Sequence, residues 1–372
     1  MAMHYVSGSW SNIGSAVSTG HCSYVKMGMD NAGNPVIGYV DSTNANNITV
    51  KRYTGAAWSD LAMPAISTNQ FSLAADRNNI IYVCAGNSSG VFNIYTYNAG
   101  AWTTTSNIAT TSTLPAYTAM AMDTVTNTPY IVYADNNTQL TVRKLNGASW
   151  PVVGSAGFTS GAYGCYYPDI KITKNSVPVV ATQEDNGPER LSCYKFSGGS
   201  WSPVGPKSFS GTHSYFTSLT LDDDNTPFVA FYDVAYAGLS VRGYSPTMNI
   251  WDTVGPRGVK PIRSGYVLSA TCNKHSAFVA FADETVGGKM SMMEINTLCY
   301  NNNATWTGDT NNTWENPSNW ACGTTPQPTS NVVIPAGATV TVNANATINS
   351  VNVQPGAAVT VGAGVTFNVL HP

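Results

Sequence analysis

The sequence predicts an all-β protein, with a six-bladed β-propeller over residues 1–298 that is closed by its N-terminal strand, and a small β-module over residues 299–372. Three observations support this prediction. A tryptophan recurs about every 50 residues, short apolar runs separated by turn residues fill each interval, and the pattern changes after residue 298. No stretch has the apolar periodicity of an amphipathic helix.

The tryptophan repeat defines the structural unit. Its spacings are 48, 44, 48, 51 and 50 residues, between Trp10, Trp58, Trp102, Trp150, Trp201 and Trp251. Each unit contains an apolar hairpin whose turn is rich in Asp, Asn, Gly and Pro, and then a third alternating run that leads to the next Trp. Four short antiparallel strands in a unit of about 45 residues are typical of a propeller blade.

The two ends of the repeat predict how the ring closes. The chain begins with a fourth-strand pattern at residues 5–13, and the last unit ends near residue 295 with no Trp after it. Pairing the first strand with the last blade would remove exposed sheet edges. We therefore expect the Trp10 strand to complete the sixth blade.

Composition and charge exclude several classes of protein. Only 10% of residues are charged, the formal net charge is −3, and Lys and Arg do not cluster, so a surface that neutralises nucleic-acid phosphates is absent. No apolar run reaches the roughly 18 residues that cross a bilayer. A weakly charged chain rich in Gly, Asn, Ser and Thr favours an extracellular or cell-surface protein without membrane insertion. Residues 1–4 lack the layout of a signal peptide, and we expect the chain to begin after a removed signal.

The seven cysteines contain no Cys-x-x-Cys pair, which argues against a zinc ribbon or a thioredoxin-type motif. Cys299 and Cys322 flank a short Trp-rich segment. Either a disulfide joins them and stabilises a small region, or both are buried thiols.

Several repeat motifs resemble those of a known class of proteins. Asn225-Thr226-Pro227 followed by Val-Ala-Phe-Tyr-Asp, and Gly-Gly-Ser-Trp-Ser-Pro-Val-Gly at residues 198–205, resemble propeller repeats of secreted and surface-anchored bacterial proteins. The resemblance covers about residues 5–298. It implies the propeller fold and an extracellular location, and it does not imply a particular activity.

The C-terminal segment has a different pattern. Trp306, Trp314 and Trp320 open it, and short β runs separated by Gly, Asn and Pro follow. The Trp-rich opening followed by Val-Ile-Pro-x-Gly-x-x-Val-Thr-Val resembles a module of large secreted bacterial proteins, which implies the start of a β-solenoid or of a small sandwich. We expect this module to be truncated from a longer surface protein; a capping domain is the alternative.

Aromatic residues recur near the start of the first strand in every unit. In a propeller, the start of the innermost strand and the end of the next strand lie at one mouth of the central channel. The aligned aromatic residues are Tyr24, Phe71, Tyr117, Tyr167, Tyr215 with Phe216, and Tyr266, and the acids aligned at the ends of the second strands are Asp41, Asp135, Glu184, Asp233 and Asp283. Aromatic rings stack on sugar C–H groups and carboxylates accept hydrogen bonds from sugar hydroxyls, which favours a carbohydrate surface. Packing between blades and capping of turns are the alternatives.

Two charged residues interrupt the innermost strands, where most units carry Ser or Ala. Unit one has Lys26 and unit four has Asp169, and they should lie opposite each other across the channel. Charges in such a position need partners. We expect either an ion pair or a hydrated contact that plugs the channel, or a pair that binds a ligand.

Unit four departs most from the repeat. It adds an aromatic-rich loop and a neighbouring charged loop, which together contain Tyr163, Tyr166, Tyr167, Glu184, Asp185, Glu189 and Arg190. Function tends to lie where loops vary on a rigid scaffold. We therefore predict that ligand binding centres on this side of the mouth.

The sequence as a whole predicts a non-catalytic extracellular binding or adhesion module for glycans, monomeric and without cofactor or metal. The alternative is a polysaccharide-cleaving hydrolase or lyase, for which Glu184, Asp185 and Glu189 would supply the two convergent carboxylates. No catalytic motif of the common hydrolases occurs. Residues 222–225 have two interpretations: they could hold a calcium ion, or they form a solvated hairpin turn. A structural spacer of a large surface protein is the third hypothesis.

Overall fold

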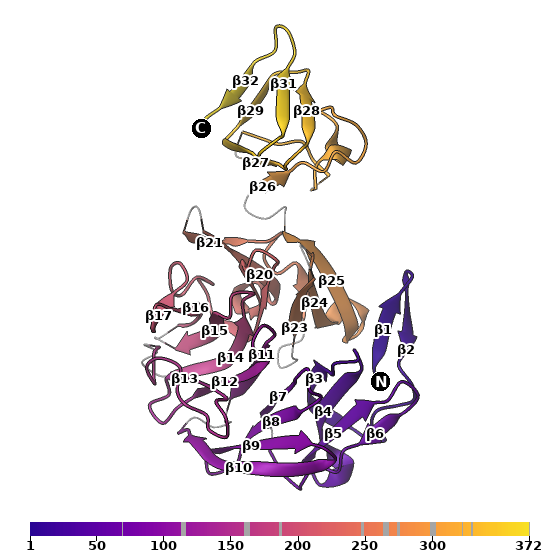
Figure 1. Cartoon of the computed structure of the whole chain (residues 1–372), viewed down its shortest axis with the longest axis vertical. Helices are drawn as coiled ribbons and strands as arrows, with labels where there is room; N and C mark the ends of the chain where they lie inside the picture. The colour runs from indigo at the N-terminus through magenta and orange to yellow at the C-terminus, as the bar shows by residue number, and fades with distance from the viewer. Residues whose placement is uncertain are drawn as a thin grey trace.

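The computed structural model describes residues 1–68, 70–112, 117–159, 164–185, 188–246, 249–262, 268–273, 276–297, 303–321, 323–328 and 330–371. Strands joined by turns and short 3-10 segments make up these residues (Figure 1), which confirms the predicted all-β class. None of the helical segments in these ranges is long and apolar enough to span a membrane.

Six antiparallel sheets form the blades of a propeller, as predicted. Blade one contains β3 (Cys22–Met29), β4 (Pro35–Asp41), β5 (Asn47–Tyr53) and β6 (Trp58–Asp60). Blade two contains β7 (Phe71–Ala75), β8 (Ile81–Gly86), β9 (Val91–Asn98) and β10 (Ala101–Thr110). Blade three contains β11 (Thr118–Asp123), β12 (Thr128–Ala134) and β13 (Leu140–Lys144). The last three contain β14 (Gly164–Ile172), β15 (Pro178–Asp185), β16 (Glu189–Ser197) and β17 (Ser200–Pro203); β18 (Ser214–Leu221), β19 (Pro227–Asp233), β20 (Gly238–Ser245) and β21 (Ile250–Thr253), with β22 (Lys260–Pro261) beside β20; and β23 (Ser269–Asn273), β24 (Ser276–Asp283) and β25 (Lys289–Asn296).

The first strand of each blade lies nearest the centre of the ring. Figure 1 shows β3, β7, β11, β14 and β23 innermost, and the strands that carry the repeated tryptophans lie outside. Consecutive inner strands contact one another from β3 through to β23. Apolar side chains fill the space between successive blades from the first to the sixth, because each sheet buries its faces against its neighbours.

Four of the six repeated tryptophans donate a hydrogen bond to the preceding unit of the repeat. The indole Nε1 of Trp58 donates to the carbonyl of Ile13 at 2.8 Å, and that of Trp102 donates to the carbonyl of Leu61 at 2.7 Å. The same bond recurs from Trp201 to Val153 at 2.8 Å and from Trp251 to Val204 at 2.7 Å. In each case the acceptor stands three residues after the Trp of the preceding unit, which explains why Trp recurs at this position.

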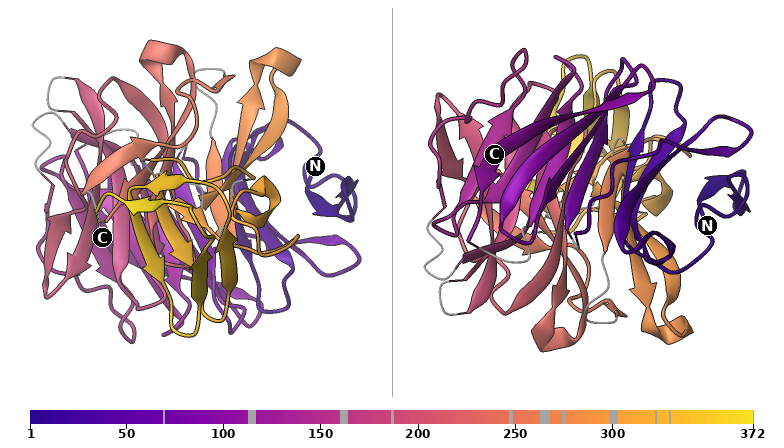
Figure 2. Two further views of the ribbon diagram at one scale, coloured as in Figure 1. Left: turned by 90° about the horizontal axis from the view of Figure 1, so that it is seen from above. Right: turned by 90° about the horizontal axis from the view of Figure 1, so that it is seen from below.

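The N-terminal segment does not close the ring, so this part of the prediction is wrong. Strand β2 (Ser9–Asn12), with Trp10, pairs with β1 (Met3–Val6), and within the described residues β25 pairs with β24 alone. In both views of Figure 2 the indigo hairpin stands at the side of the molecule, apart from the orange strands of the sixth blade. Trp10 is 49% exposed.

The reason is local. Tyr5 lies opposite Trp10, as Tyr53 lies opposite Trp58, and both pairs of ring centroids are 5.4 Å apart. Strand β1 thus repeats the third strand of a blade and reaches β2 through a tight turn, whereas pairing with β25 would have to close the whole ring. The described residues accordingly show no apolar cluster between the sixth and the first blade, and Met27 of β3 and Met290 of β25 are 65% and 71% exposed.

The C-terminal segment forms parallel coils. Strands β26 (Asn303–Thr305), β27 (Asn331–Ile334) and β30 (Ser350–Val353) pair in parallel, as do β28 (Thr339–Val342) with β31 (Ala358–Val361) and β29 (Ala346–Ile348) with β32 (Phe367–Val369). Each strand pairs with its counterpart one coil later, which is the arrangement of a β-solenoid and not of an antiparallel sandwich.

The tryptophans of this segment are structural. Trp306, Trp314 and Trp320 are buried in a core drawn from residues 304–369, and the indole of Trp320 donates to the carbonyl of Trp314 at 2.7 Å. Asn319, in the 3-10 turn η5 (Pro317–Asn319), accepts hydrogen bonds from two backbone amides of the preceding loop. Cys299 and Cys322 lie outside the described residues, so both alternatives, a disulfide and two buried thiols, stay open.

Candidate functional site

A cavity of about 200 Å³ opens at one mouth of the central channel. Its lining comes from the starts of the inner strands of six blades, and comprises Tyr24, Val25, Lys26, Gln70, Tyr117, Thr118, Tyr167, Pro168, Phe216, Thr217 and Leu268. This volume lies below the roughly 300–1,000 Å³ of typical small-molecule pockets, so the cavity suits one small unit of a larger ligand.

The lining follows the repeat of the fold. Lys26 and Asp169 occupy equivalent positions in the inner strands of blades one and four. The position two residues earlier supplies a lining residue in each of the first five blades, namely Tyr24, Gln70, Tyr117, Tyr167 and Phe216. The structure therefore brings Tyr24, Lys26, Tyr117 and Tyr167 together at one mouth, as the sequence analysis expected. Gln70 takes the place that we gave to Phe71, which is instead buried between blades one and two.

Three of these aromatic residues have an unusual backbone. Tyr24, Tyr167 and Phe216 have φ values of 51°, 47° and 58°. Each stands at a shift of register between the first two strands of its blade, which is the position of a β-bulge. The left-handed conformation is rare for bulky residues and costs energy, so the bulges place these rings at the mouth at the expense of local stability.

The aromatic rings contact one another across blades. The ring centroid of Tyr167 lies 4.8 Å from that of Tyr117 and 5.0 Å from that of Phe216. Tyr166 meets Tyr117 edge-on at 5.9 Å. Burial, and next the hydrogen bond with Tyr167, raise the pKa of Tyr117 above its ordinary value, so its hydroxyl stays protonated at neutral pH. The rings of blades three, four and five form one continuous aromatic wall.

Lys26 and Asp169 do not form an ion pair with each other. The Asp169 carboxylate accepts hydrogen bonds from the backbone N–H of Leu219 at 2.8 Å and from Lys171 at 3.2 Å. Within the described part of the chain, no carboxylate lies within 4.0 Å of the Lys26 ammonium. Burial lowers the pKa of Lys26; the charge of Asp169 opposes this effect and that of Lys171 adds to it. The cavity thus contains a cation whose expected partner is engaged elsewhere.

The remaining predicted tyrosines lie outside the cavity lining or outside the description. Tyr215 pairs with Tyr232 across strands β18 and β19, and its neighbour Phe216 lines the cavity instead. Tyr166 lies behind Tyr117 and is not part of the lining. Tyr163 and Tyr266 fall on residues that the structure does not describe.

The acidic residues of blade four do not converge on the cavity. Glu184 is 1% exposed and accepts a hydrogen bond from the Tyr194 hydroxyl at 2.5 Å. Arg190 lies opposite Glu184 on the neighbouring strand, and Glu189 lies 3.4 Å from Nδ1 of His213. Asp185 ends strand β15, and its side chain is outside the description. In the strand register Asp185 lies opposite Glu189, and none of these three acids belongs to the described lining of the mouth cavity.

Other acids serve the turns that follow the blade strands. Asp41 and Asp283 each accept a hydrogen bond from a backbone N–H two residues later, at 2.9 Å in both cases. Asp222, in the run considered for calcium, accepts from the backbone N–H groups of Asp224 and Thr226 at 3.0 and 2.8 Å. Among the described residues, no three His, Cys, Asp or Glu side chains form a group that could hold a metal ion.

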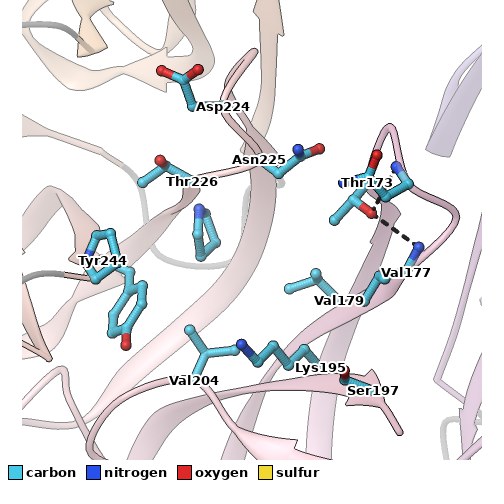
Figure 3. Close-up of a pocket in the computed structure, with 13 residues that line it drawn as sticks. Thr173, Val177, Val179, Lys195, Ser197, Val204, Asp224, Asn225, Thr226 and Tyr244 are labelled. Atoms are coloured by element: carbon cyan, nitrogen blue, oxygen red, sulfur yellow. Dashed lines mark hydrogen bonds between the residues drawn. The ribbon is translucent and has the colours of Figure 1, made fainter.

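A second cavity, of about 300 Å³, lies between blades four and five at the other end of the inner strands (Figure 3). The fold engages at least two of its polar side chains. The Thr173 hydroxyl accepts from the backbone N–H of Val177 at 2.9 Å, and the Asn225 amide oxygen accepts from the backbone N–H of Lys174 at 2.8 Å. The bond to Asn225 recurs at Asn79 and Asn127, which join the turns of earlier blades. The aromatic rings and the lysine of the mouth cavity take no part in these hydrogen bonds between turns. The mouth cavity is therefore the better candidate site.

Six lining residues were not among the predicted ones, namely Val25, Gln70, Thr118, Pro168, Thr217 and Leu268. Of these, Gln70 stands directly before the aromatic residue Phe71, which the sequence pattern favoured in unit two. Thr217 follows Phe216 in the bulge of blade five, and its hydroxyl is buried with no hydrogen-bond partner in the described structure. Counting back from the aligned positions of Lys26 and Asp169 would have found both.

No model of a known protein family matches the chain, and no curated protein matches it. The chain is similar to the solved structure of the SapL1 lectin in complex with alpha methyl fucoside, with 11% identity, a TM-score of 0.50, and coverage of 73% of this chain and 92% of that chain. It is similar to AofleA from Arthrobotrys oligospora, with 12% identity, a TM-score of 0.50, and coverage of 73% and 86%. A fungal lectin of Aleuria aurantia, described as a six-bladed β-propeller, shares 12% identity at a TM-score of 0.49, with coverage of 73% and 95%. At this identity, the first two similarities show a shared propeller fold and nothing finer.

Proposed function

We propose that the protein is a non-catalytic glycan-binding module whose binding site is the mouth cavity of the propeller. The observation that carries the proposal is the set of three bulges that hold Tyr24, Tyr167 and Phe216 in left-handed conformations around one cavity. Strain of this kind persists only where the surroundings impose it, and it concentrates at functional sites. Packing between blades alone would not require it, because the inner strand of blade two lines the same channel with no such residue in β7.

The chemistry of the lining suits a sugar. Aromatic rings offer faces to the C–H groups of a pyranose, while the hydroxyls of Tyr24 and Tyr167, the Gln70 amide and the Thr217 hydroxyl can exchange hydrogen bonds with sugar hydroxyls. SapL1, which shares the fold, is described in complex with a fucoside, so a propeller of this kind can carry a sugar site. This support is at the level of the fold.

The wider setting of the module is part of the proposal. We infer that it acts outside the cell or at a cell surface, in adhesion, as a monomer, with a glycan or a surface polysaccharide as its partner. The weakly charged composition supports this location. Residues 1–298 would form the binding domain, and residues 299–372 a separate β-solenoid.

A glycan array probed with the full chain tests the proposal. We expect the wild type to bind at least one class of glycan and Tyr24→Ala to weaken that binding by about 1–3 kcal/mol, by analogy with stacking on nucleic-acid bases. Tyr5→Ala is the matched control, since Tyr5 is an exposed tyrosine outside the cavity lining. Glycan binding that survives Tyr24→Ala, Tyr117→Ala and Tyr167→Ala alike would place the site elsewhere.

A further inference from the structure

We propose that the mouth cavity selects a sugar that carries a carboxylate, with Lys26 as the counter-ion of that group. This inference rests on the proposed glycan function and names the chemical class of the ligand. Among the described residues of the cavity lining, Lys26 alone has a formal charge, and it stands among apolar, aromatic and neutral polar side chains.

Lys26 brings a positive charge to the cavity, and no carboxylate belongs to the described lining. A cation inside a channel requires a partner, because removing it from water is costly. The fold supplies an acid across the channel, but Asp169 already accepts hydrogen bonds from Lys171 and from the backbone of Leu219, and Ser218 Oγ lies 3.4 Å from the same carboxylate. A bound anion would complete the charge balance that the described side chains leave open.

Thr217 belongs to the cavity lining, and its hydroxyl oxygen is buried with no hydrogen-bond partner among the described residues. Thr118, by contrast, is paired with Ser72, with the two hydroxyl oxygens 3.2 Å apart. The Thr217 hydroxyl therefore has bonding capacity that the described fold does not use, and a ligand at Lys26 could engage it through a rotation of the Thr217 side chain.

The charge of Lys26 should decide which class of sugar the cavity prefers. A neutral sugar would cover the Lys26 ammonium without neutralising it, and an amino sugar would bring a second positive charge to it. A uronic acid offers a carboxylate to the ammonium and apolar ring faces to Tyr24, Tyr117 and Tyr167. The cavity should therefore prefer a uronic acid over the neutral sugar of the same stereochemistry.

The preference should depend on pH. The groups that face Lys26 are Asp169 and Lys171 from blade four and the hydroxyls of Tyr24, Tyr117 and Tyr167. Since burial lowers the pKa of Lys26, its ammonium form is lost as the pH rises through a value below the ordinary lysine pKa. The advantage of the acidic sugar should disappear over that range, while binding of a neutral sugar should not follow it.

The test compares glucuronate-terminated with glucose-terminated oligosaccharides, by titration calorimetry with the full chain. We expect the wild type to bind the glucuronate form at least about tenfold more tightly, which corresponds to about 1.4 kcal/mol. Lys26→Met should remove this preference and keep the affinity for the neutral form, whereas Lys26→Arg should retain the preference. Lys174→Met is the control, since Lys174 pairs with Asp223 at the other end of the strands. Melting temperatures identify any variant that fails to fold.

The outcomes separate the two proposals. If both oligosaccharides bind equally and the mouth tyrosines are needed, the glycan function stands and the selection for carboxylate is wrong. If a sulfated sugar binds and the uronic acid does not, the cavity recognises an anion of another class and the proposal fails in its stated form. If Lys26→Met keeps the preference for glucuronate, another residue provides the counter-ion. If no glycan of either kind binds, the proposed function itself is wrong.

Discussion

The indole N–H of Trp251 donates a hydrogen bond to the carbonyl of Val204, three residues after Trp201. The two residues belong to the fifth and fourth units of the repeat, so the bond links one blade to the next. Trp251 also stacks on Phe209, with ring centroids 4.1 Å apart. The repeated tryptophan thus makes contacts between blades as well as with its own blade, where Tyr244 lies against Trp251.

Trp251→Phe should destabilise the propeller. The substitution keeps an aromatic ring against Phe209 but leaves the Val204 carbonyl without its donor, which should cost about 1–3 kcal/mol of unfolding free energy. Urea denaturation followed by tryptophan fluorescence measures the effect. Trp10→Phe is the control and should change stability by less than about 0.5 kcal/mol, because Trp10 lies on an exposed hairpin. A larger loss at Trp10 than at Trp251 would show that the hairpin contributes more to the ring than its pairing indicates.

Glycine should be better tolerated than alanine at Tyr167. The φ of 47° at this residue is a left-handed conformation, which costs an L-residue roughly 1–2 kcal/mol and glycine almost nothing. Tyr167→Gly should therefore be more stable than Tyr167→Ala, as measured by thermal or denaturant unfolding. Lys195, an exposed residue of strand β16, provides the comparison, and there alanine should be the more stable by about 0.5–1 kcal/mol. The same order at both positions would mean that Tyr167 is not held in a strained conformation.

Acid should destabilise the third blade through Asp123. Its burial raises the pKa, but hydrogen bonds from Thr126, Ser176 and the backbone more than offset that effect, so the pKa of Asp123 lies below its ordinary value. A lowered pKa in the folded state contributes stability that is complete above about pH 4, the unfolded value, and is lost as the pH falls through the folded value. Asp123→Asn should remove this contribution and flatten the dependence of the denaturation midpoint on acid pH. Asp223→Asn, at an exposed pair with Lys174, should leave it in place.

Residues 1–298 should fold without the C-terminal segment. Their apolar clusters contain no residue beyond 298, and the cluster of the solenoid contains none before 304. Expression of residues 1–298 should give a soluble protein with a cooperative thermal transition by circular dichroism. Recovery of aggregate alone would show that the solenoid is needed for the propeller to fold.

The sequence was sufficient for the blades because each unit encodes the same contacts. Trp102 and Trp201 meet equivalent carbonyls through equivalent strands, so a spacing of residues translates directly into a ring of sheets. The closure of the ring was harder to predict from the sequence, because residues 5–13 contain both a Trp that fits a fourth strand and a Tyr that fits a third strand. Which partner β2 takes depends on the competition between a tight turn and a long-range contact, and residue pattern does not measure that competition.

The candidate site was predicted in part for the same reason. Tyr24, Tyr117, Tyr167 and Lys26 were found together because the strand register carries them to one mouth. The exchange of Tyr215 for Phe216 depends on a bulge, in which a positive φ turns one residue toward the channel in place of its neighbour. The hydrogen bond from the Leu219 backbone to Asp169 depends on the distance between two blades, and the contact from Lys171 depends on side-chain conformation within strand β14; composition and spacing contain neither.

Strand β25 has one edge without a strand partner among the described residues, so the ring of blades is open between blade six and blade one. Tyr24 of blade one and Leu268 before blade six line the same cavity from the two sides of the split, where the described residues form neither a shared sheet nor an apolar cluster. Within the described residues, apolar clusters join blade one through to blade six, and none joins blade six to blade one. We expect that small rotations between blades would change the width of the cavity, and that a ligand in contact with both Tyr24 and the opposite wall would hold the two ends of the ring together.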